Sequence, residues 1–184
     1  IINYKSIKMK RNILLILSVM LIISCQNDNV KNSIYEANNM IFSKHVKTFK
    51  NHFLKGFETK NIDLMSEMYS DSLYWNGPNE GGDDWGKKEI SEVFSFYIEN
   101  FDKIELKDQL YFGGTVYSAQ GNPTSNPDYV RVVGTWHSTH KETNVETKTK
   151  WHAVMWFNED GKVYRGSDWM DVAGIEKQIA RAIE

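Results

Sequence analysis

The amino-acid sequence predicts an α+β protein in which helices precede an antiparallel β-sheet. Segments with helical periodicity occupy the first half of the chain, and segments rich in β-branched and aromatic residues fill most of the second half. The two kinds of segment are segregated rather than alternating, which favours helices packed on one face of a curved sheet. With 184 residues and 41% hydrophobic content, the chain is long enough for one domain with its own core.

The first 24 residues predict a signal peptide that is not part of this domain. From Met9 the chain begins with the basic residues Lys10 and Arg11 and continues with an apolar run over residues 13–23. This run is shorter than the ~20 apolar residues that cross a bilayer, so a secretory signal is favoured over a membrane-spanning helix. Residues 1–8 precede a natural start at Met9 and are interpreted as a gene-start error or a cloning remnant.

Ser24 and Cys25 follow the apolar run. The sequence Ile-Ile-Ser-Cys that ends at Cys25 resembles a bacterial lipobox, in which the cysteine is lipidated. The resemblance implies cleavage before Cys25 and a lipid on its thiol, which would anchor the protein to a membrane of the cell envelope, on its periplasmic or surface side. The alternative is an ordinary secretory signal followed by an incidental cysteine. Polar residues without periodicity follow, so residues 25–38 are expected to form a lipidated tether and residues 39–184 the domain.

The charge and the residue patterns argue against several classes of partner. The first 24 residues carry four basic and no acidic side chains, so processing would change the formal net charge from −2 to −6 and disfavour nucleic acid as a partner. His137 and His140 lie three apart on an expected strand and point to opposite faces, so no metal site is predicted. The sequence also lacks a glycine-rich phosphate loop, and we expect no cofactor.

Three helices are predicted from the spacing of apolar residues. The second helix begins at Asn61, which is a good N-cap, and extends to residue 69. The other two each place their large residues on one face; these residues are Phe42, Val46, Phe49, Phe53 and Phe57 in the first helix, and Ile90, Val93, Phe94, Tyr97, Ile98 and Phe101 in the third.

Strands are predicted over residues 104–112, 115–119, 129–140, 146–157 and 162–170. Residues 120–128 (QGNPTSNPD) are expected to form a polar loop that two prolines interrupt. A turn over residues 158–161 joins the last two strands, and Gly161 suits the positive φ that such a turn needs. A short helix is expected to close the chain.

Three stretches in this order carry a resemblance to a known family: NIDLMSEMYSDSLYWNGPN, GKKEISEVFSFY and WFNEDGKVYRGSDWMDVAGIEKQI. Their order and spacing resemble the nuclear transport factor 2-like (NTF2-like) superfamily, and within it the SnoaL-like proteins, over residues 41–179. The resemblance implies a cone: a strongly curved antiparallel sheet wrapped around three N-terminal helices and enclosing a mostly apolar pocket. Members include isomerases, cyclases, hydrolases and non-catalytic binding domains, so the fold leaves the function open.

The chemistry of ketosteroid isomerase-like members is not expected in this chain. The resemblance places Phe53, Gly77 and Ala153 where those enzymes have a tyrosine, an aspartate base and a second acid. None of these three side chains can donate or accept a proton.

Strand parity instead points to Asp168 as the candidate catalytic residue. If Ala153 faces the pocket, Trp151 and Met155 do so as well. Pairing Phe157 with Lys162 across the turn would place Asp168 opposite Trp151, in an apolar wall that raises its pKa and suits a general acid or base. The alternatives are a place near the open end of the cone or a structural bond to Trp151 or a tyrosine. The expected pocket comprises Phe53, Phe57, Trp75, Trp136, Trp151, Met155, Tyr164 and Met170.

Two functional hypotheses follow. In the first, the domain holds a small, largely apolar or aromatic molecule without catalysis; in the second, it is a cofactor-independent lyase, isomerase or hydrolase that uses Asp168. The Asp168→Asn variant is expected to be no less stable than the natural protein near neutral pH. His137, His152, Trp156 and Arg165 are expected on the outer face of the sheet, which we predict to form a homodimer surface.

Overall fold

The computed structural model describes residues 34–79, 81–118 and 121–182. The expected signal peptide and Cys25 lie outside the described residues. The chain divides into two compact units, residues 1–40 and 41–184. The described end of the expected tether is helical rather than irregular, because residues 34–40 form helix. Among the described residues, no helix has the length and apolar character to span a membrane.

The second unit opens with the helices that the apolar spacing predicts. Residues 41–48 are α-helical, and the helix continues as a π-helical stretch, η1 (Phe49–Leu54), and as α2 (Lys55–Thr59). The short helix α3 (Ile62–Glu67) follows, and its predicted cap is confirmed because the Asn61 side chain accepts a hydrogen bond from the Leu64 N–H at 3.0 Å. Tyr69, expected at the end of α3, instead begins a strand.

Helix α4 (Lys87–Asn100) follows after the first strand and confirms the third predicted helix. The Glu89 side chain accepts a hydrogen bond from the Gly86 N–H at 2.9 Å and so caps the helix start. Phe49, Phe53 and Phe57 of the first helix and Ile90 and Phe94 of α4 are buried in one shared core.

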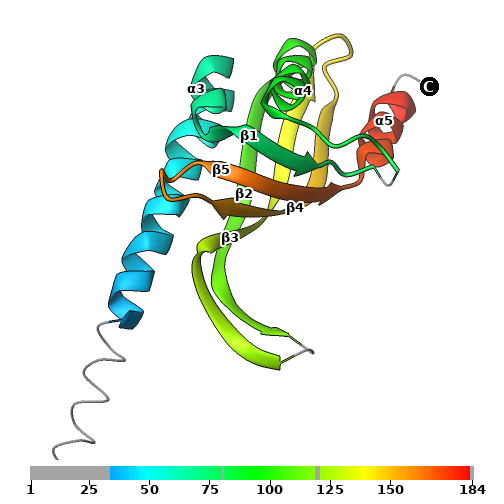
Figure 1. The fold of residues 1–184 in the computed structure, drawn as a ribbon. Coiled ribbons are helices and arrows are strands. Elements are labelled where there is room, and N and C mark those ends of the chain that lie inside the picture. The colour runs from blue at the N-terminus through cyan, green and yellow to red at the C-terminus, as the bar shows by residue number, and fades with distance from the viewer. Residues whose placement is uncertain (1–33, 80, 119–120, 183–184) are drawn as a thin grey trace, which may run out of the picture. The chain divides into compact units, whose positions relative to one another are not determined.

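Five strands form one sheet in the order β1-β5-β4-β3-β2 (Figure 1). The strands are β1 (Tyr69–Asn76), β2 (Phe101–Ser118), β3 (Gly121–His140), β4 (Glu146–Phe157) and β5 (Val163–Met170). The expected antiparallel pairing holds for β2 to β5, whereas β1 runs parallel to β5. A parallel pair needs a long connection, and here all of α4 and β2 to β4 lie between the two strands.

Strands β2 and β3 bend strongly along their length (Figure 1). Their register shifts between Asp102 and Glu105 and again between Lys107 and Leu110. Lys103 and Asp108, one within each shift, have positive φ angles of 53°. Such bulges bend a strand and increase its twist, so they account for the curvature of the sheet.

The prediction of a loop over residues 120–128 is wrong. From Gly121 onward this segment belongs to β3 and pairs with β2, with Asn126 opposite Gly114 and Thr124 opposite Val116. Strand β4 pairs with β3 only from Tyr129 onward, so residues 121–128 form an edge. Both prolines of the segment fall within register shifts of this pair, which lie opposite Gly113–Gly114 and Val116–Ser118 of β2. Proline is tolerated at edges and bulges because no ladder hydrogen bond depends on its missing N–H there.

The turn between β4 and β5 forms as predicted, but the register of the hairpin differs. Gly161 has a φ of 76°. Asp168 lies opposite Ala153 rather than opposite Trp151, because the turn pairs Phe157 with Val163 instead of Lys162 and β5 carries one extra residue between Val163 and Arg165. The difference at Trp151 is two residues, so Asp168 and Trp151 still share the inner face. The bulge turns Tyr164 outward.

Helix α5 (Val172–Arg181) closes the described chain. Its N-cap is Asp171, whose carboxylate accepts a hydrogen bond from the Gly174 N–H at 2.8 Å. Ile175 is buried and faces the cavity described next.

Candidate functional site

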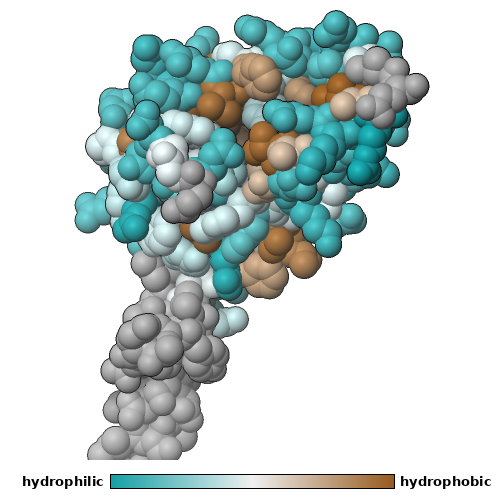
Figure 2. Space-filling view, turned by 90° about the vertical axis from the view of Figure 1, so that its right-hand side faces the viewer, coloured by the Kyte–Doolittle hydropathy of each residue, from teal (hydrophilic) through white to brown (hydrophobic). Residues whose placement is uncertain are grey.

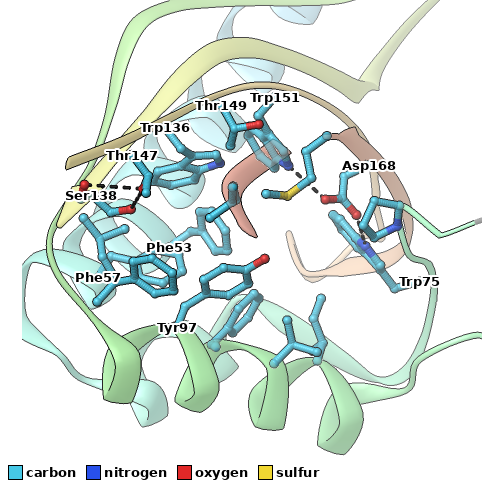
Figure 3. Close-up of a pocket in the computed structure, with 18 of the residues that line it drawn as sticks. Phe53, Phe57, Trp75, Tyr97, Trp136, Ser138, Thr147, Thr149, Trp151 and Asp168 are labelled. Carbon is cyan, nitrogen blue, oxygen red and sulfur yellow. Dashed lines mark hydrogen bonds between the residues drawn. The ribbon is translucent and has the colours of Figure 1, made fainter. Parts of the chain in front are cut away.

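A cavity of about 90 Å³ lies between the sheet and α4 (Figure 3). On the same measure one water needs roughly 10–15 Å³, so the cavity has room for a small organic molecule. Its lining comes from η1, α2, β1, α4, α5 and the four other strands. On the face that Figure 2 shows, the surface is mainly hydrophilic, with hydrophobic residues visible between hydrophilic ones in its upper part.

Asp168 is held in this cavity by two tryptophans. Its Oδ1 accepts a hydrogen bond from the Trp75 Nε1–H at 2.8 Å, and its Oδ2 accepts one from the Trp151 Nε1–H at 2.9 Å (Figure 3). Asp168 as a whole residue is only 8% exposed. The structural bond to Trp151, which was one alternative from the sequence, is therefore present, and Trp75 provides a second one.

The arrangement of Trp75 depends on a glycine in the neighbouring strand. Trp75 of β1 lies beside Gly166 of β5, and a Cβ atom at position 166 would overlap the Trp75 ring. Gly166 therefore lets the indole lie flat over β5 and reach Asp168 two residues further along. The backbone of Trp75 also exchanges two hydrogen bonds with Trp85, of 2.9 and 2.8 Å, which fixes the loop before α4.

Burial changes the ionisation of several groups in the cavity. The pKa of Asp168 is raised above its ordinary value by desolvation, which outweighs the opposing effect of the hydrogen bonds from Trp151 and Trp75. The pKa of Tyr69 and that of Tyr97 are also raised, first by burial and second by the nearby charge of Asp168. Figure 3 shows the Tyr97 hydroxyl directed into the cavity.

Aromatic rings form much of the cavity wall. Trp151 is stacked on Phe53, with ring centroids 6.1 Å apart and an angle of 12° between the planes. Most other neighbouring rings meet at steep angles: 74° between Phe53 and Phe94, and 64° between Phe57 and Trp136. The rings therefore form the walls of a box rather than the sides of a flat slot.

A second polar group lies away from Asp168, beside Phe57 and Trp136 (Figure 3). Ser138 and Thr147, on neighbouring strands, share a hydrogen bond of 2.8 Å between their hydroxyl oxygens. Both residues line the cavity, as does the buried Thr149. These hydroxyl groups can each donate and accept hydrogen bonds, so this end of the cavity can bind an uncharged polar group.

The structure brings most of the expected pocket residues together. Besides Asp168, the residues that line the cavity include Phe53, Phe57, Trp75, Trp136, Trp151 and Met170. Two expected residues do not line it: Met155 is buried elsewhere in the core, and Tyr164 is 40% exposed because of the bulge in the hairpin. Whether the lining residues bind a ligand stays a prediction.

Trp85 and Tyr97 line the cavity but were missed in the sequence. The signal for Tyr97 was present, because it shares a helical face with Ile90 and Phe94. Trp85 lies in a loop rich in glycine and aspartate, and no local pattern indicates that it packs inward.

Among the described lining residues, Asp168 is the only one that carries a formal charge. In the described part of the chain, no group of three or more His, Cys, Asp or Glu side chains is placed to hold a metal ion. The chemistry available in the cavity is therefore that of one buried carboxyl group, tyrosine and indole donors, and a few hydroxyls.

Comparisons with known proteins identify the fold. No family model matches the chain, and no curated protein matches its sequence. Solved structures do match. They include an NTF2-like protein from Burkholderia xenovorans LB400, with 15% identity, a TM-score of 0.54, and coverage of 74% of this chain and 96% of that one.

Two further matches are assigned as enzymes. One is an LEH-like epoxide hydrolase from M. tuberculosis, with 12% identity, a TM-score of 0.52, and coverage of 77% of this chain and 92% of that one. The other is assigned as a SnoaL-like polyketide cyclase from Shewanella denitrificans OS-217, with 11% identity, a TM-score of 0.56, and coverage of 74% and 97%. At these identities the likeness establishes the fold and leaves the activity open.

Proposed function

We propose that this protein, which has the NTF2-like fold of the SnoaL-like proteins, binds a small, largely apolar molecule in its cavity without transforming it. One observation carries the proposal: each oxygen of the single charged group in the described lining already accepts an indole hydrogen bond. Asp168 thus has a structural role in a cavity that is otherwise mostly aromatic and aliphatic. Apolar pockets with a few polar groups are typical of sites that bind small molecules.

The direct test is to fill the cavity by mutation and measure binding. Val93 of α4 lines the cavity, whereas its neighbour Glu92 is exposed. We expect Val93→Trp to abolish the binding of a compact, neutral, largely apolar probe, 3,3-dimethylbutan-1-ol, measured by calorimetric titration, and Glu92→Trp to leave it unchanged. Equal binding by both variants, with both folded by circular dichroism, would contradict the proposal. Mass spectrometry of protein purified from its native host would then identify the natural ligand.

A cofactor-independent lyase, isomerase or hydrolase is the second candidate. The raised pKa of Asp168 favours it, because a carboxyl group whose pKa is closer to neutrality is a better general acid or base. Asp168 also lies opposite Ala153, the position where ketosteroid isomerase-like members have their second acid. If this candidate is correct, Asp168→Asn should lose turnover but keep substrate binding. If the binding proposal is correct, neither the natural protein nor the Asp168→Asn variant converts a molecule of the class that the cavity binds.

We also propose that the lipid on Cys25 attaches the protein to a membrane of the cell envelope. The support is the apolar run followed by Ile-Ile-Ser-Cys. In a bacterial host, Cys25→Ser should abolish fatty-acid labelling and move the protein to the soluble fraction. Membrane association of a processed Cys25→Ser protein would contradict the lipid anchor.

A further inference from the structure

We infer that the ligand of this cavity is a small organic ammonium ion with compact alkyl substituents. The inference rests on the proposed binding function and adds the chemical class of the ligand. Three features of the cavity carry it: the uncompensated carboxylate, the arrangement of the aromatic rings, and the separate group of hydroxyls.

The first feature is charge. Neither Lys nor Arg nor His is among the described residues that line the cavity, and the two partners of Asp168 are neutral indoles. Indole donors satisfy the hydrogen-bonding capacity of a carboxylate in part, but they do not neutralise its charge. A neutral ligand that fills the cavity would leave that charge buried without a counter-ion. A cation in the cavity would supply one.

The second feature is the box of aromatic rings. Phe53 meets Phe94 at 74° and Trp136 at 65°, and all three rings line the cavity, so its aromatic walls are not parallel. The face of an aromatic ring is negatively polarised and attracts an ammonium group within about 6 Å of its centroid. A flat molecule needs parallel walls, whereas the rings here suit a compact, rounded group such as trimethylammonium.

The third feature is the pair of hydroxyls on Ser138 and Thr147, which lies apart from Asp168 in the same cavity (Figure 3). An ammonium group placed at Asp168 would direct its longer substituent toward this pair. A hydroxyl or carbonyl oxygen on that substituent could then be bound. An amino alcohol with an alkylated nitrogen combines both groups.

The experiment compares two probes of the same shape. Choline carries a trimethylammonium group, and 3,3-dimethylbutan-1-ol replaces its nitrogen with carbon and so lacks the charge. Calorimetric titration of the full domain should show at least about 10-fold tighter binding of choline, in line with a desolvated cation–π contact and an ion pair. Asp168→Asn should reduce choline binding by a similar factor and leave the neutral probe unchanged.

A second variant keeps the test informative if Asp168→Asn fails to fold. Trp136→Leu retains the carboxylate and removes one ring, so it should weaken choline binding more than binding of the neutral probe. The control is Trp169→Leu, since Trp169 is 51% exposed on the outer face and should affect neither probe.

The outcomes separate the two proposals. Equal affinity for both probes would overturn the ammonium inference and leave the binding function standing. Binding of 3,3-dimethylbutan-1-ol with no detectable binding of choline would do the same. Absence of binding by both probes would overturn both proposals.

Discussion

The inner and outer faces of the β4–β5 hairpin carry similar side chains in different surroundings. On the inner face, the indole of Trp151 donates to the buried carboxylate of Asp168. On the outer face, Trp169 lies 5.2 Å from the ring of His152, and Arg165 lies over the ring of Trp156 at 5.0 Å. The outer contacts are ring contacts at the surface, whereas the inner contact is a hydrogen bond shielded from water.

The difference shows how solvent sets the energetic weight of a contact. A hydrogen bond between buried groups is costly to break because neither group can turn to water instead. Contacts between partly exposed charged and aromatic groups contribute less, since water replaces them when they are lost. The outer-face His152 has a lowered pKa because of partial burial and the nearby charge of Arg131, so it favours its neutral form. This face is also where we propose that the domain dimerises.

The largest effect is expected from Asp168→Ala. The change leaves the indole N–H groups of Trp75 and Trp151 without an acceptor in a buried site, at a cost of about 1–3 kcal/mol for each. We therefore expect a loss of roughly 3 kcal/mol in the free energy of unfolding, measured by urea denaturation. A loss below about 1 kcal/mol would mean that these two bonds have little weight.

Asp168→Asn should be intermediate, which revises the expectation from the sequence that it would be no less stable near neutral pH. An amide has one oxygen and one NH₂ group, so one of the two indole donors loses its acceptor.

A matched pair of Trp→Phe variants would compare the two faces directly. Trp151→Phe removes a donor to the buried Asp168 and should cost roughly 1–3 kcal/mol. Trp169→Phe removes part of a half-exposed ring and should change stability by about 0.5 kcal/mol or less. Thermal unfolding of both variants measures the difference. Equal losses would show that burial is not what separates the two faces.

The pH dependence of stability provides a smaller effect with a defined sign. Because the pKa of Asp168 is higher in the folded state than its ordinary value, the folded protein binds more protons between those two values. The contribution of Asp168 to stability therefore falls as pH rises from ~4 through its folded-state pKa. Comparing the natural protein with Asp168→Asn at each pH isolates this contribution.

The same comparison cancels the contributions of two other groups, whose effect on stability has the opposite pH dependence. The pKa values of Asp71 and Asp102 are lowered, chiefly by hydrogen bonds to Lys87 and Lys60. Both pairs are present in both proteins and so cancel. If the difference between the two proteins instead grows in favour of the natural one as pH rises, the raised pKa is wrong.

The smallest effect on folding is expected from outer-face changes that test the dimer. Trp156→Asp and Trp169→Asp should give monomers in size-exclusion chromatography while the domain keeps its fold, because a charge in an apolar interface opposes association. His137, on the neighbouring strand β3, is expected to be part of the same surface. A natural protein that is already monomeric at high concentration would contradict the dimer.

The sequence by itself determined the features that depend on neighbours along the chain. Apolar spacing placed Phe49, Phe53 and Phe57 on one helical face, and the side-chain period of two in a strand placed Asp168 and Trp151 on one side of the sheet. Gly161 indicated its turn because only a local backbone angle was involved.

Only the tertiary structure decided which residues complete the site. The bulge that turns Tyr164 outward depends on how β4 and β5 pair, and a shift by one residue changes which side a side chain faces. Trp75 reaches Asp168 because β1 pairs in parallel with β5 across a distance of more than 90 positions in sequence. Such contacts depend on which strands become neighbours in the sheet, and no periodicity within a single segment records that choice.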